Sequence, residues 1–230
     1  DNLTNYNGAI NMKELGYLFG ERLQKLHELP DTHINLNYLH KSVEAPTELE
    51  SCFNFVKPSV VYHLACPPRQ KVVSHNPGAN ANTMIAGLLN VLQLCLKYQV
   101  ERIVYVSSSM VYGDFKDGMS EAGKTKPKNI YGEAKLAGER LTKLFNMRDN
   151  LNYVICRPSG VYGPGDMPDR VVSKFFDKAM NNEDITLHNG SNKVDFTYID
   201  DAIEAISKII LMPPRNKIPF SIYNIANSRL

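Results

Sequence analysis

The sequence predicts an α/β fold in which parallel strands form a doubly wound sheet, followed by part of a small C-terminal lobe. Apolar runs of strand length alternate along the chain with longer segments whose apolar residues recur at helical spacing. Two of the runs, residues 59–66 (SVVYHLAC) and 102–109 (RIVYVSSS), carry apolar side chains on both faces. Strands of this kind are typical of parallel sheets that helices cover on both sides.

Other elements precede the first of these strands. Apolar residues at helical spacing predict a helix over residues 13–29, and Pro30 ends it. Residues 33–39 alternate like a strand, and we expect Thr47 to cap a short helix that reaches Val56.

The middle of the chain continues the alternation of helices and strands. A long helix over residues 77–98 has an apolar side and precedes the strand at 102–109. A helix over 131–146 and a strand over 152–159 follow. His63, inside an apolar strand, is expected to be a core histidine rather than a ligand.

The regular alternation of strands and helices ends at a Gly/Pro-rich loop after Gly160. The elements predicted beyond it are a helix over residues 171–180, short strands over 185–190 and 193–199, a helix over 200–211 and a strand over 220–226. We expect Phe175 and Phe176 to lie in the core, and Asp200 and Asp201 to favour a helix N-terminus.

Composition excludes several classes of protein. The 26 basic and 24 acidic residues leave a net charge of +2, too little for a nucleic-acid partner. No apolar run approaches the length needed to span a membrane, and the polar N-terminus does not resemble a signal peptide. The cysteines lack metal-ligand spacing and are expected to be buried thiols of a cytoplasmic, metal-free protein. They are Cys52, Cys66, Cys95 and Cys156.

Chemistry concentrates where the strand at 102–109 ends in three serines. Ligands bind beyond the carboxyl ends of the strands in such sheets, and the next helix carries Tyr131 and Lys135 four residues apart. An ammonium beside a phenol favours the phenolate, so Tyr131 is a candidate base that takes a proton from an alcohol. A solvated helix surface would explain the Tyr–Lys spacing alone, but not its order after the serines.

The sequence resembles the extended short-chain dehydrogenase/reductases, the NAD-dependent nucleotide-sugar epimerases and dehydratases. The matching segments occur in family order; they are VVYHLA, NVLQLCLKYQVERIVYVSSSMVYG, YGEAK, CRPSGVYGPG and DFTYIDDAIEAI. The start DNLTNYNGAINMKEL and the loop VYGPGDMPD are most similar to UDP-glucuronate 4-epimerases. The resemblance implies a Rossmann-like fold, NAD as the cofactor, a nucleotide-sugar substrate and a homodimer formed through the helices at 77–98 and 131–146.

The resemblance also implies roles for single residues. Tyr131 would be the catalytic base, Lys135 would lower its pKa and hold the nicotinamide ribose, and Ser108 would hydrogen-bond the sugar hydroxyl. The residues implied in cofactor binding are Asp1, Asn2, Ser42, Val43, Leu64, Ala65, Cys66, Tyr131, Lys135, Pro158 and Ser159. The residues implied in substrate binding are Ser108, Ser109, Lys71, Gly160 and Lys193.

The implied reaction is 4-epimerisation of a UDP-sugar of the glucuronate or galactose type. The sugar is oxidised at C4 to a 4-keto intermediate, rotates, and receives hydride on its other face. Dehydratases of the family carry Asp and Glu where this chain has Ser109 and Met110, which favours epimerisation. A 4,6-dehydratase or a reductase remains the alternative enzyme.

Against the family pattern, residues 1–160 are expected to be a partial NAD-binding domain that lacks the first strand, the Gly-rich turn and the first helix. Residues 161–230 are expected to hold interleaved substrate-lobe segments plus a returning helix at 200–212 and strand at 220–226. These 230 residues are therefore expected to be inactive on their own. Ligand contacts also differ from the family at Ser42, Met84, Gly160 and Val194, which leaves open a non-catalytic protein with impaired cofactor binding.

Overall fold

The computed structural model describes residues 39–67, 70–114, 118–164, 166, 169–187, 194–211 and 222–227. Residues 1–42 and 43–230 form two separate units, and the elements below belong to the second. The predicted helix at 13–29 and nearly all of the predicted strand at 33–39 lie outside the described residues.

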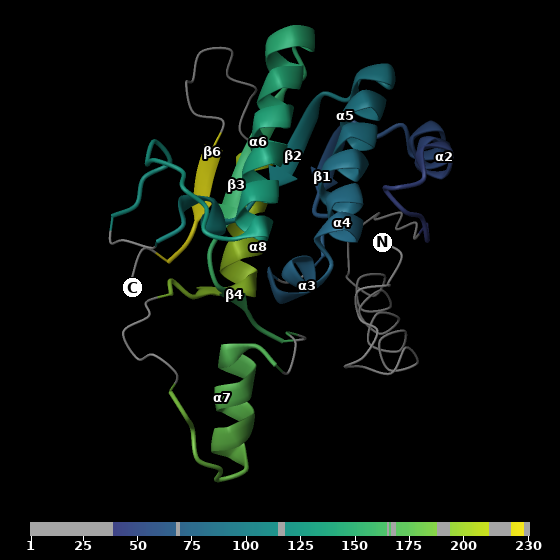
Figure 1. The fold of residues 1–230 in the computed structure, drawn as a ribbon. Coiled ribbons are helices and arrows are strands. Elements are labelled where there is room, and N and C mark those ends of the chain that lie inside the picture. Colours follow the sequence, from purple (N-terminus) through teal and green to yellow (C-terminus); the bar gives the residue numbers. More distant parts are fainter. Residues whose placement is uncertain are drawn as a thin grey trace, which may run out of the picture. The chain divides into compact units, whose positions relative to one another are not determined.

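Among the described residues, four parallel strands form one sheet, in the order β1-β2-β3-β6 (Figure 1). They are β1 (Val60–His63), β2 (Arg102–Val106), β3 (Tyr153–Pro158) and β6 (Ile222–Ile225). Because each strand runs in the same direction, their carboxyl ends meet at one edge of the sheet. The predicted doubly wound parallel sheet is confirmed, although each strand is shorter than the sequence suggested.

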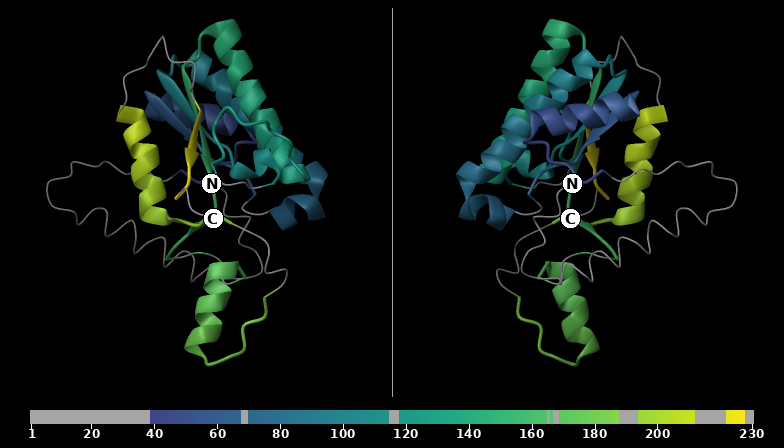
Figure 2. Two further views of the ribbon diagram at one scale, coloured as in Figure 1. Left: turned by 90° about the vertical axis from the view of Figure 1, so that its left-hand side faces the viewer. Right: turned by 90° about the vertical axis from the view of Figure 1, so that its right-hand side faces the viewer.

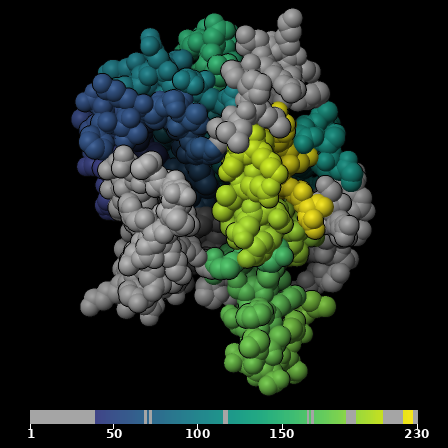
Figure 3. All heavy atoms as spheres, turned by 180° about the vertical axis from the view of Figure 1, so that it is seen from behind, coloured from purple at the N-terminus to yellow at the C-terminus, as the bar shows by residue number. Residues whose placement is uncertain are grey.

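Helices cover both faces of the sheet, as Figure 2 shows from the two sides. On one face lie α5 (Gly87–Lys97) and α6 (Ile130–Asp149), with α2 (Pro46–Val56) packed beside α5. The other face carries α8 (Ile199–Leu211), the yellow-green layer seen from behind in Figure 3. The acidic residues Asp200 and Asp201 lie in the first turn of α8, as expected of a helix N-terminus.

Strand alternation separates the core on the two faces of the sheet into two clusters. Ile103, Tyr105 and Ile155 face α5 and α6, whereas Val104 and Val154 face α8. The residues that follow with the same alternation, Ser107 after Tyr105 and Arg157 after Ile155, therefore point toward α6. This periodicity delivers polar side chains to the edge where the strands end.

The predicted helix at 77–98 is one helical run with a π-helical turn inside it. It comprises α4 (Pro77–Ala81), the π turn η2 (Asn82–Ala86) and α5. By length and composition alone, Pro77–Lys97 is long and apolar enough to cross a membrane, contrary to the sequence expectation. Core helices of globular proteins meet the same criterion, and α5 packs its leucines against the sheet.

Several local predictions are wrong. Thr47 does not cap α2, because that helix begins one residue earlier, at Pro46, which is well suited to a first turn. Residues 185–187 form no strand, and the segment at 193–199 contributes only β5 (Thr197–Tyr198), paired with β4 (Val161–Tyr162). The short helix α3 (Gln70–His75) was not predicted.

Helix α7 (Val171–Met180) corrects the expectation for the phenylalanine pair. It has no buried residue, and 64% of Phe176 is exposed. The ribbon of α7 stands apart from the sheet in Figure 1, and Phe175 is half-buried rather than part of the core. Helical spacing identified the apolar face correctly but could not say what packs on it.

Helix α6 approaches β2 closely enough to require a glycine. A methyl group added at Gly138 would overlap the Tyr105 hydroxyl and press on Leu88. Both neighbours are fully buried, so neither can move away freely. The contact sets the distance between α6 and the sheet.

We therefore expect Gly138→Ala to lower the free energy of unfolding by about 1–3 kcal/mol, as overpacking of a filled core does. Gly78→Ala is the matched control, because nothing lies within 4 Å of the added methyl group in that helix. The control should be neutral or stabilising by up to about 1 kcal/mol. Urea unfolding of both variants of the natural full-length protein measures the difference, and equal effects would contradict the close packing of α6.

Candidate active site

The candidate site lies at the carboxyl ends of β1, β2 and β3. Strand β2 ends at Val106, and the serine run then turns into the short 3₁₀ helix η3 (Ser109–Tyr112). Ser108 caps this turn, because its Oγ accepts a hydrogen bond of 3.2 Å from the backbone N–H of Met110. The serines thus leave the sheet in a defined conformation at the edge where ligands bind in such folds.

Helix α6 brings the other candidate residues to the same place. Asn129 caps it, with its side chain accepting a 2.8 Å hydrogen bond from the N–H of Gly132. Tyr131, Lys135 and Glu139 follow at intervals of four residues and therefore share one face of the helix. The second and third residues of this row, Lys135 and Glu139, are 3% and 0% exposed.

Lys135 links α6 to the end of β2. Its Nζ donates a 2.7 Å hydrogen bond to the carbonyl oxygen of Val106. The same nitrogen lies 5.8 Å from the ring centroid of Tyr131 and 5.5 Å from that of Tyr105. Its ammonium group therefore lies within cation–π distance of two aromatic rings.

The electrostatics at Tyr131 differ from the sequence expectation. Burial raises the pKa of Tyr131 well above its ordinary value, and the neighbouring Cys66 raises it further. A hydrogen bond with Ser108 and the charge of Arg170 lower this pKa but do not outweigh burial. In the chain by itself the pKa of Tyr131 is therefore raised, and the predicted lowering of this pKa by Lys135 stays a prediction.

The structure gives the serines different roles. The Ser107 hydroxyl donates a 2.7 Å hydrogen bond to Glu139 Oε1 and so faces into the protein. Ser108, the next residue, faces Tyr131 instead. Ser108 and Ser109 are both 8% exposed, so burial does not distinguish them, and the choice of Ser108 as the serine that contacts the sugar stays a prediction.

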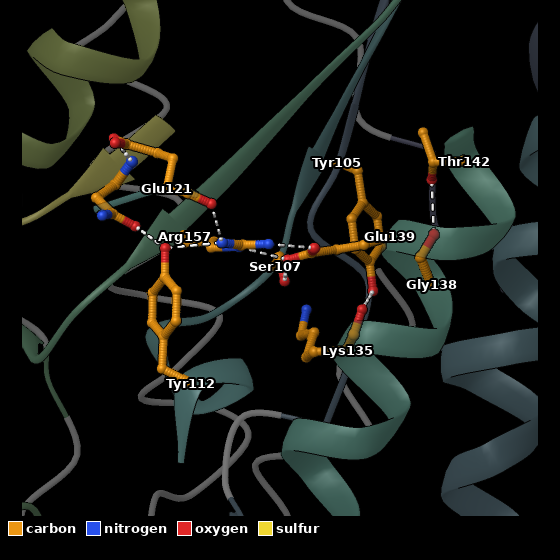
Figure 4. A network of polar contacts seen from close by, with 10 residues as sticks. Tyr105, Ser107, Tyr112, Glu121, Lys135, Gly138, Glu139, Thr142 and Arg157 are labelled. Atoms are coloured by element: carbon orange, nitrogen blue, oxygen red, sulfur yellow. Dashed lines mark hydrogen bonds and ion pairs between the residues drawn. The ribbon is translucent and has the colours of Figure 1, made fainter. Parts of the chain in front are cut away.

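Sequence reasoning missed a buried ion pair beside these residues (Figure 4). Arg157 of β3 donates to both carboxylate oxygens of Glu139, from Nε at 2.8 Å and from Nη2 at 2.7 Å. Pairing with Glu139 raises the pKa of Arg157, although burial alone would lower it. An arginine inside an apolar strand was the available signal, since buried charges are almost always paired.

Further hydrogen bonds connect the ion pair to η3 and β6. Arg157 Nη1 donates a 2.7 Å hydrogen bond to the Tyr112 hydroxyl, which donates to Asn224 Oδ1 at 2.8 Å. The backbone N–H of Asn224 donates to Glu121 Oε1 at 2.8 Å. One network therefore joins α6, β3, η3 and β6 (Figure 4).

The end of β3 carries three of the predicted contacts. Pro158 is the last strand residue, and Ser159 is 3% exposed. Within the described part of the chain, the Ser159 Oγ has no hydrogen-bond partner. Gly160 has φ +38°, and an added Cβ would overlap the backbone oxygen of Asp195, so a glycine is required there.

The remaining predicted residues lie in several places. Leu64, Ala65 and Cys66 form the loop after β1, with Leu64 60% exposed. Val43 packs on the core beside Gly87, and its carbonyl oxygen accepts a hydrogen bond from Asn90.

Other predicted contacts cannot be placed at the site. Ser42 belongs to the separate unit of residues 1–42. Lys71 lies in α3, but its side chain is outside the described part, as are Asp1, Asn2 and Lys193 entirely. Their roles stay predictions.

Two of the departures from the family pattern are visible. Met84 is 2% exposed in the π turn η2, and a Cγ of Val194 lies against Gly160. Both therefore fill space with apolar groups.

His63 lies in the core, as predicted. It is 4% exposed and stacks on Tyr105, with ring centroids 5.9 Å apart. Burial, aided by the charge of Lys135, lowers the pKa of His63 to about 3. The imidazole is therefore neutral at physiological pH.

The thiols and possible metal ligands add no second centre. All four cysteines are free; Cys95 and Cys156 are buried, and burial raises the pKa of each to about 12. Cys52 and Cys66 are only partly buried, so the expectation of burial holds for two of the four. Among the described residues, no group of three or more His, Cys, Asp or Glu side chains could hold a metal ion.

Comparison with known proteins places the chain in a broader context. Residues 17–226 match the NAD dependent epimerase/dehydratase family. UDP-glucuronate 4-epimerase 1 of Arabidopsis thaliana is 32% identical over 196 residues, which cover 78% of this chain and 46% of that protein.

Solved structures share the fold. The UDP-glucuronic acid 4-epimerase of Bacillus cereus, crystallised with UDP-glucuronic acid and NAD, is 25% identical with a TM-score of 0.77. The alignment covers 92% of this chain and 65% of that one. A dTDP-glucose 4,6-dehydratase from Streptomyces venezuelae, 21% identical with a TM-score of 0.77 over 98% of this chain and 64% of that one, supports the fold alone. The chain thus spans between 46% and 65% of the length of these three relatives.

The depressed pKa of His63 predicts how stability depends on pH. Below about pH 6.5 the unfolded chain binds a proton that the folded chain excludes, so stability falls as the pH drops toward about 3. This group alone should contribute a loss of about 1.4 kcal/mol per pH unit within that window.

Replacing the group tests this linkage. Urea unfolding at about pH 7.5 and about pH 5 should show a smaller loss of stability for His63→Phe than for the unmodified protein. The exposed His75 provides the control, and His75→Phe should keep the original pH dependence. An unchanged pH dependence in His63→Phe would contradict a buried neutral imidazole.

Proposed function

The chain belongs to the NAD-dependent epimerase/dehydratase family, and on that premise we propose that the natural protein is a nucleotide-sugar 4-epimerase of the UDP-glucuronate or UDP-galactose type. The observation that carries the proposal is the convergence of Ser108, Tyr131 and Lys135 at the carboxyl end of β2. A hydroxyl, a phenol and an ammonium at one point suit proton transfer to and from a sugar hydroxyl.

Each residue has a distinct task in this proposal. Ser108 orients the sugar by a hydrogen bond to its C4 hydroxyl, and Tyr131 removes the proton from that hydroxyl. Lys135, fixed on the Val106 carbonyl, keeps a positive charge beside the phenol. After the 4-keto intermediate has turned, the same phenol returns the proton to the C4 oxygen, so one tyrosine acts first as base and then as acid.

The described residues fit the nicotinamide end of NAD. The loop at residues 64–66 and the Pro158–Ser159 step flank the edge of the sheet, and the buried Ser159 hydroxyl offers an unused donor. Lys135 and Tyr131 lie between them. NAD, when bound, supplies a hydride acceptor for the sugar carbon and a positive ring charge.

Epimerisation is favoured over dehydration by the residues that follow Ser108. Ser109 and Met110 occupy the first positions of η3, where the family resemblance implies the acidic pair of a dehydratase. Without carboxylates at these positions, the turn offers no acid for eliminating water from the sugar. A dehydratase or a reductase is the second candidate. Absorbance of a 4-keto product would identify a dehydratase, and consumption of added NADH would identify a reductase.

Other properties of the natural protein stay proposals. A homodimer formed through residues 77–98 and 131–146 and a cytoplasmic location rest on resemblance and composition. The alternative of a non-catalytic protein is decided by calorimetry with NAD on the full-length chain, since tight binding would exclude impaired cofactor binding.

Replacing the base is the direct test. Tyr131→Phe in the full-length protein should lower kcat for UDP-glucuronate or UDP-galactose by about a hundredfold or more, because general acid–base catalysis contributes about 10² to 10⁴. The substitution removes only the hydroxyl and keeps the ring beside Lys135.

A second tyrosine controls for the loss of a hydroxyl as such. Tyr62 lies on β1 and is 43% exposed, so Tyr62→Phe should keep full activity. Activity is followed by conversion of each sugar nucleotide to its C4 epimer. Equal activity of Tyr131→Phe and the unmodified protein would show that Tyr131 is not the base.

A further inference from the structure

Two charged side chains next to the proposed site take no part in the proposed reaction. The side chains of Glu139 and Arg157 are 0% and 3% exposed, and they form a bidentate ion pair. Desolvating two charges is expensive, and an apolar pair of similar volume often stabilises a core as well. Stability alone is therefore a weak explanation for this pair, and its contacts point elsewhere.

Those contacts lie on both sides of Ser108. Ser107, just before it, donates its hydroxyl to Glu139, and Tyr112, at the end of η3, accepts from Arg157. The segment from Ser107 to Tyr112 is thus tied to the ion pair at both of its ends (Figure 4). Ser108 is held between these two ties.

We propose that the Glu139–Arg157 ion pair is a positioning unit that holds the end of β2 and η3 against α6, so that Ser108 meets Tyr131. The proposal rests on the proposed function only where activity is its readout. Neither residue is assigned contact with the substrate or cofactor.

The geometry explains why one tie would not be sufficient. Lys135 bonds the Val106 carbonyl, and Glu139, one helical turn further on, bonds the Ser107 hydroxyl. A helix held at a single point can rotate about it, whereas two ties to consecutive residues, the last of β2 and the one after it, restrict both rotation and sliding. The first turn of the helix, which carries Tyr131, then has one position relative to Ser108.

The far side of the network orients the arginine. The Tyr112 hydroxyl donates a hydrogen bond to Asn224 Oδ1 on β6. Arg157 also donates a hydrogen bond to the backbone oxygen of Glu121 at 3.3 Å. The guanidinium is therefore fixed from both sides, by Glu139 and by this group. Because the arginine is fixed in this way, its bonds to Glu139 hold α6 in one place relative to β3 and β6.

Single-hydroxyl variants test the proposal without leaving a charge unpaired. Ser107→Ala removes the tie before Ser108, and Tyr112→Phe removes the tie after it, while the ion pair remains. Each should lower kcat about tenfold to a hundredfold with KM changed less than about threefold, since a displaced catalytic group costs rate rather than binding.

Thr142→Val is the matched control. The Thr142 hydroxyl is also buried on α6, but it bonds the Gly138 carbonyl of its own helix. Losing it should leave kcat within about twofold, as expected of a residue away from the reacting groups.

The NMR resonance of the Tyr131 ring, assigned with Tyr131→Phe, gives a readout that requires no turnover. It should move in Ser107→Ala and Tyr112→Phe and stay in place in Thr142→Val. If both test variants keep kcat within about twofold and leave the Tyr131 resonance unchanged, the positioning role is overturned. If the unmodified protein epimerises neither sugar, the proposed function fails, and the resonance alone decides the positioning role.

Discussion

The buried ion pair between Glu139 and Arg157 is the interaction on which the arrangement of the site depends. Both charges lie out of reach of water, so each is tolerable only while the other is in place. Removing one partner of such a pair costs about 3–5 kcal/mol because the other charge is left uncompensated. Helix α6 therefore cannot shift on the sheet by a turn or a slide without a large penalty, and the helix that carries Tyr131 and Lys135 inherits that constraint.

Close packing imposes the complementary limit. Gly138 lets α6 descend onto Tyr105, whose hydroxyl reaches the Lys135 carbonyl at 3.3 Å. The ion pair acts one residue later, so a steric stop and an electrostatic tie occupy adjacent positions of the helix. Strand alternation explains why both contacts come from the same face, because Tyr105 and Arg157 point toward α6 from neighbouring strands. Strand order brings the strand ends together, and the alternation of side chains along each strand decides which of them face α6.

The fold could be predicted because its signals are local. Continuous apolar strands and helical periodicity identified the parallel sheet and α6, and the order of serine, tyrosine and lysine identified the residues that converge on β2. Contacts between distant segments carry no such local signal. Glu139 and Arg157 looked like unrelated charges, 18 residues apart, until the fold brought them together. The exposure of Phe176 was missed for the same reason, since periodicity reveals an apolar face but not its partner.

The direction of the Tyr131 pKa was missed because the spacing of two residues says nothing of how deeply the phenol is buried. Burial outweighs the hydrogen bond with Ser108 and the charge of Arg170, so the pKa of Tyr131 is raised and the phenol stays protonated near neutral pH. In the proposed epimerisation that state suits the second half, in which the alkoxide formed from the keto sugar receives a proton. The first half needs the phenolate, and only positive charge or stronger hydrogen bonding at the hydroxyl can lower the pKa. The hydrogen bond with Ser108 already lowers the pKa of Tyr131. The relative position of Ser108 and Tyr131 therefore also affects the proton affinity of the phenol.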